Sequence, residues 1–71
     1  MLNMDVLENQ WPKLRGQVRQ TWKALTVEDL DRIDGHFDTL VEVLREKYGY
    51  AKPYAQTEVE QFIQAAIGQA L

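Results

Sequence analysis

The sequence predicts an all-α fold, a small bundle of about four short helices arranged as two packed helical hairpins. Apolar residues recur at spacings of three and four along the chain, and no alternating stretch is long enough to indicate a strand. Pro12 and Pro53 stand where helices can begin, and Gly35 and Gly49 where helices can bend or end. Because the chain has only 71 residues, we expect a single domain over residues 1–71 with a small core.

The first helix is predicted over residues 11–25, where the apolar side chains form one stripe. The members of this stripe recur at spacings of 3, 4, 4 and 3, and they are Trp11, Leu14, Val18, Trp22 and Leu25. Gly16 interrupts the helix at a cost of about 1 kcal/mol relative to alanine. We therefore expect another backbone to approach Gly16 closely.

A short second helix is predicted over residues 27–33. Thr26 and Asp29 match a capping box at its start, since each side chain can bond the backbone N–H of the other residue. Asp34 then offers a cap and Gly35 a bend before the next helix.

Two longer helices complete the predicted bundle. The third is expected over residues 37–48, ending at Gly49, with an apolar face of Phe37, Leu40, Val41, Leu44 and Tyr48. The fourth begins near Pro53, with an apolar face of Ala55, Val59, Phe62, Ile63, Ala66 and Ala70. The predicted core comprises Trp11, Leu14, Val18, Trp22, Leu30, Ile33, Leu40, Leu44, Val59 and Phe62.

Charge is unevenly distributed in this chain, whose net charge is -3. Residues 11–25 carry four cations and no acid, whereas residues 26–46 carry seven acids and two cations. Three of the basic residues form a ladder at a spacing of four, namely Arg15, Arg19 and Lys23. Asp38, Glu42 and Glu46 have the same spacing, so we expect the two ladders to pair inside the domain and relieve the repulsion within each.

The residue inventory argues against enzyme chemistry. The chain has no serine, no cysteine and a single histidine, and no threonine has that histidine beside it by spacing. We expect no catalytic residues and no cofactor. Without cysteine there is no disulfide framework, so the cytoplasm is the default location, and we expect neither a signal peptide nor a membrane span.

Three aspartates and the histidine near the junction of the second and third helices are the best candidates for metal ligands. Asp31, Asp34, His36 and Asp38 could converge only if the helix continued through Gly35. Their spacing matches neither an EF-hand loop nor a zinc motif. Caps and solvated acids explain them better, so we expect no metal.

The sequence YGYAKPYA, residues 48–55, suggests two alternatives. A glycine turn between helices can present N–H groups to a phosphate, but this one has a single glycine and a single lysine. Helix termination by Gly49, with three tyrosines packed around the hairpin, is the favoured interpretation. Tyr48, Tyr50 and Tyr54 remain the best candidates for exposed aromatic side chains. The candidate binding surface comprises Lys13, Arg15, Arg19, Lys23, Tyr50, Lys52 and Tyr54.

Several segments together resemble the CsbD-like family of small bacterial stress-response proteins. They are LRGQV at 14–18, TWKALT at 21–26, IDGHFDTLVEVLREKYGY at 33–50 and TEVEQF at 57–62. The resemblance covers residues 11–62 and implies a small helical bundle expressed under general stress, with no established enzyme activity, cofactor or ligand. Lys23 and Glu42 stand where that family commonly has glycine, so a close backbone approach is not expected there.

These observations predict a non-enzymatic stress-response protein that acts through a protein partner. Such a protein would expose an apolar patch, which we expect at AAIGQAL, residues 65–71, and at Leu2, Met4, Val6 and Leu7. The alternative is a weak nucleic-acid-binding protein that uses the basic first helix. We expect a monomer or a weak dimer and no contact with membranes.

Overall fold

Helices packed around one apolar core make up the part of the chain that the structure describes. A computed structural model describes residues 5–69 of the chain, with side chains for residues 6–66. Within residues 5–69 there are five helices and no strand, so the all-α prediction is confirmed there. The helices are α1 (Asp5–Asn9), α2 (Trp11–Thr21), α3 (Val27–Ile33), α4 (Phe37–Tyr48) and α5 (Lys52–Gln69).

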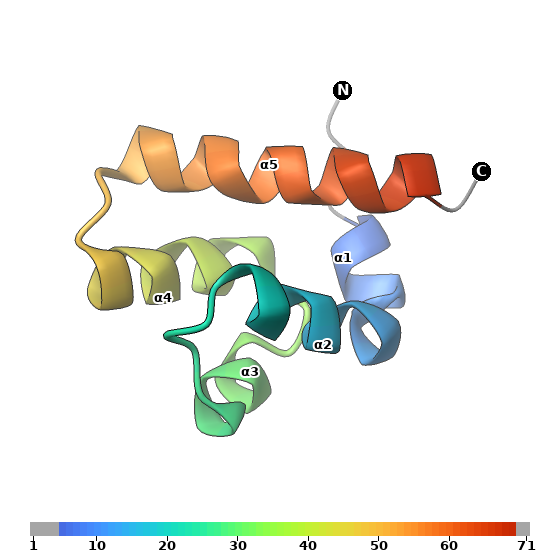
Figure 1. The fold of residues 1–71 in the computed structure, drawn as a ribbon, viewed down its shortest axis with the longest axis horizontal. Helices are drawn as coiled ribbons and strands as arrows, with labels where there is room; N and C mark the ends of the chain where they lie inside the picture. Colours follow the sequence, from blue (N-terminus) through green and yellow to red (C-terminus); the bar gives the residue numbers. More distant parts are fainter. Residues whose placement is uncertain (1–4, 70–71) are drawn as a thin grey trace.

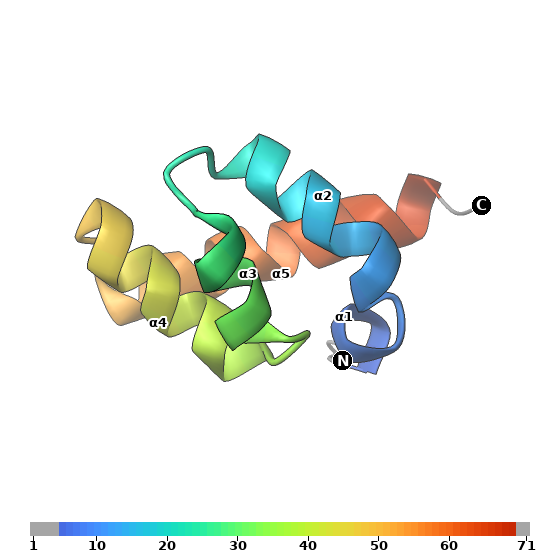
Figure 2. The same ribbon diagram turned by 90° about the horizontal axis from the view of Figure 1, so that it is seen from below.

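Helix α5 is the longest and lies antiparallel along α4 (Figure 1). The other close pairs are α3 with α4, α1 with α2 and α1 with α5. The α4–α5 hairpin is therefore as predicted, whereas α2 and α3 are not a close pair. Figure 2 shows α2 crossing the bundle from α1 toward the end where α4 meets α5.

Helix α1 is absent from the prediction, which placed Val6 and Leu7 in an apolar patch that the core does not need. Leu7 is completely buried, and Val6 packs against the core. That part of the prediction is wrong, because a helix of five residues is too short to show a periodic pattern. The predicted Leu2 and Met4 lie outside the described residues, as do the side chains of residues 67–71.

Helix α2 ends earlier than predicted, at Thr21 instead of Leu25. The five residues of the predicted stripe are nevertheless all buried. Thr26 is the N-cap of α3 and has an extended backbone, at φ -96° and ψ 169°. The helical conformation of α2 must therefore end before Thr26. Leu25 enters the core from the resulting turn, where its N–H donates to the carbonyl of Trp22 at 3.1 Å.

Gly16 also differs from the prediction, because no backbone approaches it. It lies on the exposed side of α2, and a Cβ built there would have no other atom within 4 Å. The expected close approach is therefore wrong, and Gly16 only weakens its helix.

We expect Gly16→Ala to stabilise the protein by about 0.5 to 1 kcal/mol, since alanine is the better helix former and fits without a clash. Urea unfolding followed by circular dichroism measures this change. A lower unfolding midpoint than the wild type would contradict the open environment of Gly16.

The bounds of α3 and α4 agree with the prediction, and the turn between them has two left-handed residues. Asp34 adopts φ 46° and ψ 39° as the C-cap of α3, and Gly35 follows with φ 80°. His36 is the N-cap of α4 but makes no side-chain capping bond. Asp34 therefore ends one helix and does not begin the next.

The core contains only hydrophobic side chains among the described residues. Nine of the ten predicted members are buried, and the tenth, Phe62, is half-buried and packs against the others. Val43 is buried but was not predicted, because α4 packs against both α3 and α5 and so buries a wider arc than one stripe. Tyr48, which was placed on the apolar face of α4 and also among the exposed aromatic candidates, is 38% exposed.

Candidate binding surface

Three tyrosines form a continuous aromatic cluster at the turn between α4 and α5. The rings of Tyr48 and Tyr50 are stacked, with centroids 5.2 Å apart and planes 14° apart. Tyr54 meets Tyr50 edge-on, with centroids 4.7 Å apart. Tyr54 and Tyr48 are exposed, while Tyr50 is half-buried and packs against the core. The predicted packing of the tyrosines around this hairpin is therefore confirmed.

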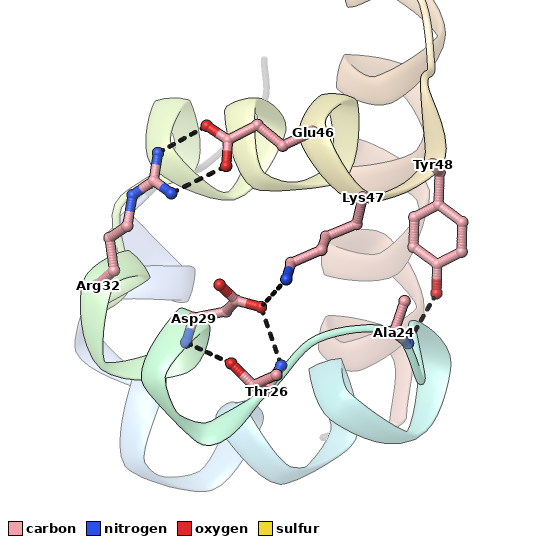
Figure 3. Close-up of polar contacts among 7 residues, drawn as sticks. All are labelled: Ala24, Thr26, Asp29, Arg32, Glu46, Lys47 and Tyr48. Carbon is pink, nitrogen blue, oxygen red and sulfur yellow. Dashed lines mark hydrogen bonds and ion pairs between the residues drawn. The ribbon is translucent and has the colours of Figure 1, made fainter.

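A hydrogen bond connects the cluster to the loop between α2 and α3. The hydroxyl of Tyr48 accepts a hydrogen bond from the backbone N–H of Ala24 at 3.1 Å (Figure 3). Because Lys23 precedes Ala24, this bond places the backbone of Lys23, the last cation of the predicted basic ladder, at the edge of the cluster. We call the surface formed by Lys23, Tyr48, Tyr50, Lys52 and Tyr54 the tyrosine end.

Tyr50 is uncharged at neutral pH. Partial burial raises the pKa of its hydroxyl, and the neighbouring Tyr54, Glu58 and Tyr48 raise it further. The positive charge of the tyrosine end therefore comes from Lys23 and Lys52, and Glu58 places a negative charge near Tyr50.

A capping box begins α3, and its Asp29 also forms an ion pair with Lys47 of α4. Asp29 Oδ2 accepts the backbone N–H of Thr26 at 2.9 Å, and the Thr26 hydroxyl accepts the N–H of Asp29 at 3.1 Å. Lys47 Nζ lies 3.1 Å from the same Asp29 oxygen (Figure 3). The bond from the Thr26 N–H lowers the pKa of Asp29, and Lys47 lowers it further, while burial opposes both. The predicted capping box is confirmed.

We expect acid to destabilise the protein partly through Asp29. Its folded pKa lies below the ordinary value of 3.8, so the stability that it contributes is present above that pH and is lost as the pH falls through the folded pKa. In Asp29→Asn, the fall in unfolding free energy below about pH 4 should be shallower than in the wild type. Urea unfolding across that range measures it, with Asp38→Asn as the control. Equal slopes in the wild type and Asp29→Asn would contradict this role.

The two charged ladders do not pair with each other, so that prediction is wrong. Arg15 Nη2 instead contacts Asp31 Oδ1 at 3.0 Å, and among the described residues Arg19 and Lys23 form no ion pair. Helix α4 lies against α3, not against α2, and so its acids find other partners. Lys23 also leaves the ladder, because α2 ends at Thr21.

Two of the three acids of α4, Glu42 and Glu46, are bound by arginines of α4 itself and of α3. Glu46 accepts two bonds from Arg32, at 3.0 and 2.9 Å (Figure 3). These bonds and the guanidinium charge lower the pKa of Glu46. Glu42 pairs with Arg45 at 3.1 Å one turn away. Such exposed pairs are screened by solvent, so each contributes little stability.

An open hollow of about 320 Å³ lies between α3 and the first turns of α4. Its lining consists of Arg32, Asp38, Thr39 and Glu42, and we call it the acidic hollow. The sequence prediction did not include this site, although the spacing of Asp38 and Glu42 was a signal that both lie on one flank of a helix.

The acidic residues at the junction of α3 and α4 have separate structural roles and do not form a metal site. Asp31 binds Arg15, and Asp34 ends α3 in the left-handed conformation. Helix α3 stops at Ile33, so the continuous helix that convergence required does not exist. In the part of the chain with described residues, no group of three or more histidine or acidic side chains is placed to hold a metal ion.

The remaining sequence-predicted residues are spread over the surface. Lys13 is exposed at the third position of α2, ten residues before Lys23 in the chain. Lys23 and Glu42, which stand where glycine is common in the family resembled, both carry exposed side chains. No helix in the described range is long and apolar enough to cross a membrane.

Comparison with known proteins places the chain in a family. A UPF0337 protein of Pseudomonas aeruginosa is 41% identical over 61 residues, which cover 86% of this chain and 94% of that protein. The UPF0337 protein YjbJ of Escherichia coli is 38% identical over 58 residues, covering 82% and 84%. A UPF0337 protein of Bordetella pertussis is 34% identical over 61 residues, covering 86% and 92%. No protein-family model and no solved structure matches the chain. At this identity over most of its length, the chain belongs to the UPF0337 family.

Proposed function

We propose that this protein acts in the bacterial stress response by binding a partner protein at the tyrosine end, and that it catalyses no reaction. The observation that carries this proposal is the exposure of large apolar side chains. Among the described residues only three large hydrophobic side chains are exposed, and two of these are Tyr48 and Tyr54, at 38% and 52%. Tyrosine is enriched in protein interfaces because its ring buries a large area and its hydroxyl can still bond.

The tyrosine end is also held in place before any partner arrives. Tyr48 is fixed by its bond to Ala24, and each ring of the cluster contacts another. A side chain that is already ordered loses less conformational entropy on binding, so a given contact area yields more affinity. This order favours a binding role for the cluster.

The absence of catalysis is supported by the residues available. The chain has no serine or cysteine, and its single histidine, His36, is exposed at a helix start. The core of the described residues is wholly apolar, so it buries no titratable group that could serve as an activated acid or base. The stress-response role rests on the resemblance to the CsbD-like family.

Site-specific photo-crosslinking tests the proposed binding surface. A photoreactive amino acid at position 54 should give a discrete protein adduct in stressed bacterial cells. The same amino acid at the exposed position Gln64, farther along α5, is the matched control. Cells that lack the protein should survive stress less well, and Tyr54→Ala should restore survival less than Gln64→Ala does. Equal adducts at both positions and equal restoration would contradict the proposal.

A second candidate function is nucleic-acid binding through α2. The observation in its favour is that Lys13, Arg19 and Lys23 make no ion pair within the described part of the structure. Against it, Arg15 is bound by Asp31, Lys23 lies beyond the helix, and the chain is acidic overall. These features leave no continuous basic ladder along α2.

We therefore expect only weak binding to duplex DNA. Three free cations on one surface would give a log-log salt slope of about 3 in magnitude, whereas we expect a slope below about 1 and no measurable binding at physiological salt. Fluorescence anisotropy of a labelled duplex at several salt concentrations measures this slope. A steep slope that disappears in a folded Arg15→Ala, Arg19→Ala, Lys23→Ala triple variant would instead establish the nucleic-acid function.

A further inference from the structure

The tyrosine end is basic on a protein that is acidic. Lys23 and Lys52 belong to it, and Lys47 nearby is matched by Asp29 at 3.1 Å, while the whole chain carries a net charge of -3. The acid beside this end is Glu58, whose charge acts on Tyr50. Lys23 and Lys52 make no ion pair among the residues that are described, so they present net positive charge beside exposed rings.

The acidic hollow has the complementary character. Asp38 and Glu42 lie one turn apart on its α4 side. Arg32 is matched by both oxygens of Glu46, and Glu42 is matched by Arg45 at 3.1 Å. The unmatched charge of the hollow is therefore that of Asp38, which makes no ion pair in the described part of the chain. A volume of about 320 Å³ has room for one tyrosine or lysine side chain, and the hollow is open to solvent.

Charge also decides how two copies can meet. Two tyrosine ends facing each other in a symmetric dimer would bring the lysines of both copies together, and two hollows would bring carboxylates together. Like charges placed against each other in an interface are unfavourable, so neither symmetric pairing is satisfactory. We propose that the tyrosine end docks on the acidic hollow of a second copy, with Lys52 and Tyr54 meeting Asp38 and Glu42. This rests on the proposed function, for which it names the partner protein.

The two surfaces lie toward opposite ends of α4. Asp38 and Tyr48 are ten residues apart on one helix, which places them about 15 Å apart along its axis. One copy can therefore use both surfaces at once, and a head-to-tail contact that does not close extends into short chains. The contact involves few side chains, so it belongs with small, weak interfaces and forms mainly at high protein concentration.

Sedimentation velocity from micromolar to millimolar concentration tests the self-association. The wild type should show a sedimentation coefficient that rises with concentration at low salt and rises less at high salt, because salt screens the lysine–carboxylate attraction. Lys52→Glu and Asp38→Lys should each weaken association about five- to tenfold, because they turn an attraction into a repulsion. The double variant with both substitutions should recover the wild-type association to within about threefold.

Two further variants separate the proposed contact from general effects of charge. Lys13→Glu changes the net charge as Lys52→Glu does, but lies far from the tyrosine end, and should leave association unchanged. Tyr54→Ala should weaken association about fivefold or more, because the proposed contact buries its ring. Circular dichroism of each variant establishes that it is folded.

Three results would overturn the inference: no concentration dependence in the wild type, equal effects of Lys13→Glu and Lys52→Glu, or no recovery in the double variant. Its failure can be told from failure of the proposed function by the crosslinking at position 54. An adduct with a different protein, and no self-association, refutes the second copy as partner and leaves the binding function standing. No adduct at position 54 together with no self-association refutes both.

Discussion

Replacing Gly35 with alanine should destabilise the protein by about 3 to 4 kcal/mol, because two separate costs combine at this position. Gly35 has φ 80°, in the left-handed region that disfavours a side chain. An added Cβ would also lie 2.9 Å from the Cα of Glu8, 3.2 Å from the Cβ of Trp11 and 3.3 Å from the carbonyl of Leu7. The turn between α3 and α4 packs directly on the junction of α1 and α2, where backbone cannot easily move aside.

Gly49→Ala is the matched control for this prediction. Gly49 has φ 70°, but a Cβ there would have no atom within 4 Å, so only the conformational cost of about 1 kcal/mol applies. Urea unfolding of both variants by circular dichroism separates the two costs. Equal losses of unfolding free energy in Gly35→Ala and Gly49→Ala would mean that the α1–α2 junction does not contact the turn in solution.

The parts of the fold that were predictable from sequence are those fixed by local chemistry. The capping box of Thr26 and Asp29 sets the start of α3, and Gly49 in the left-handed conformation sets the end of α4. Both signals act through backbone groups within a few residues in the chain, so they can be recognised without knowing which other helices pack nearby. The bounds of α3 and α4 agree with the prediction for this reason.

The parts that were missed depend on packing between distant segments. Helix α1 spans five residues and exists because Leu7 is buried against the rest of the core, including contacts between α1 and α5. The end of α2 was misplaced because Leu25 is buried from a turn, and an apolar residue has the same appearance in a turn as in a helix.

The candidate site shows the same division. Helical spacing placed Arg15 and Arg19 on one flank of their helix, but it cannot say which neighbour that flank meets, and the partner is Asp31 of α3. The tyrosines were individually predicted as exposed aromatic candidates. Their connection to the loop between α2 and α3 could not be predicted, because it depends on a hydrogen bond between residues 24 and 48.

Trp22→Ala should destabilise the protein by about 3 to 5 kcal/mol, the range for removal of a large buried aromatic side chain. Trp22 is 4% exposed, and its ring lies 5.4 Å from that of Phe62 on α5. The backbone N–H of Trp22 donates to the carbonyl of Val18 and would remain in the variant, so the loss measures the side chain alone.

Such a loss is large for a domain of this size. At about 0.05 to 0.15 kcal/mol per residue, a chain of 71 residues has roughly 4 to 10 kcal/mol of stability. Trp22→Ala should therefore lose about a third or more of the total stability, and its melting midpoint should fall clearly below that of the wild type in thermal melts followed by circular dichroism. Trp22→Phe is the control, since it keeps a ring against Phe62 and should lose less stability than alanine. A melting midpoint unchanged in Trp22→Ala would mean that the ring lies at the surface, which would supply the tyrosine end with a fourth aromatic side chain and reopen base stacking as its function.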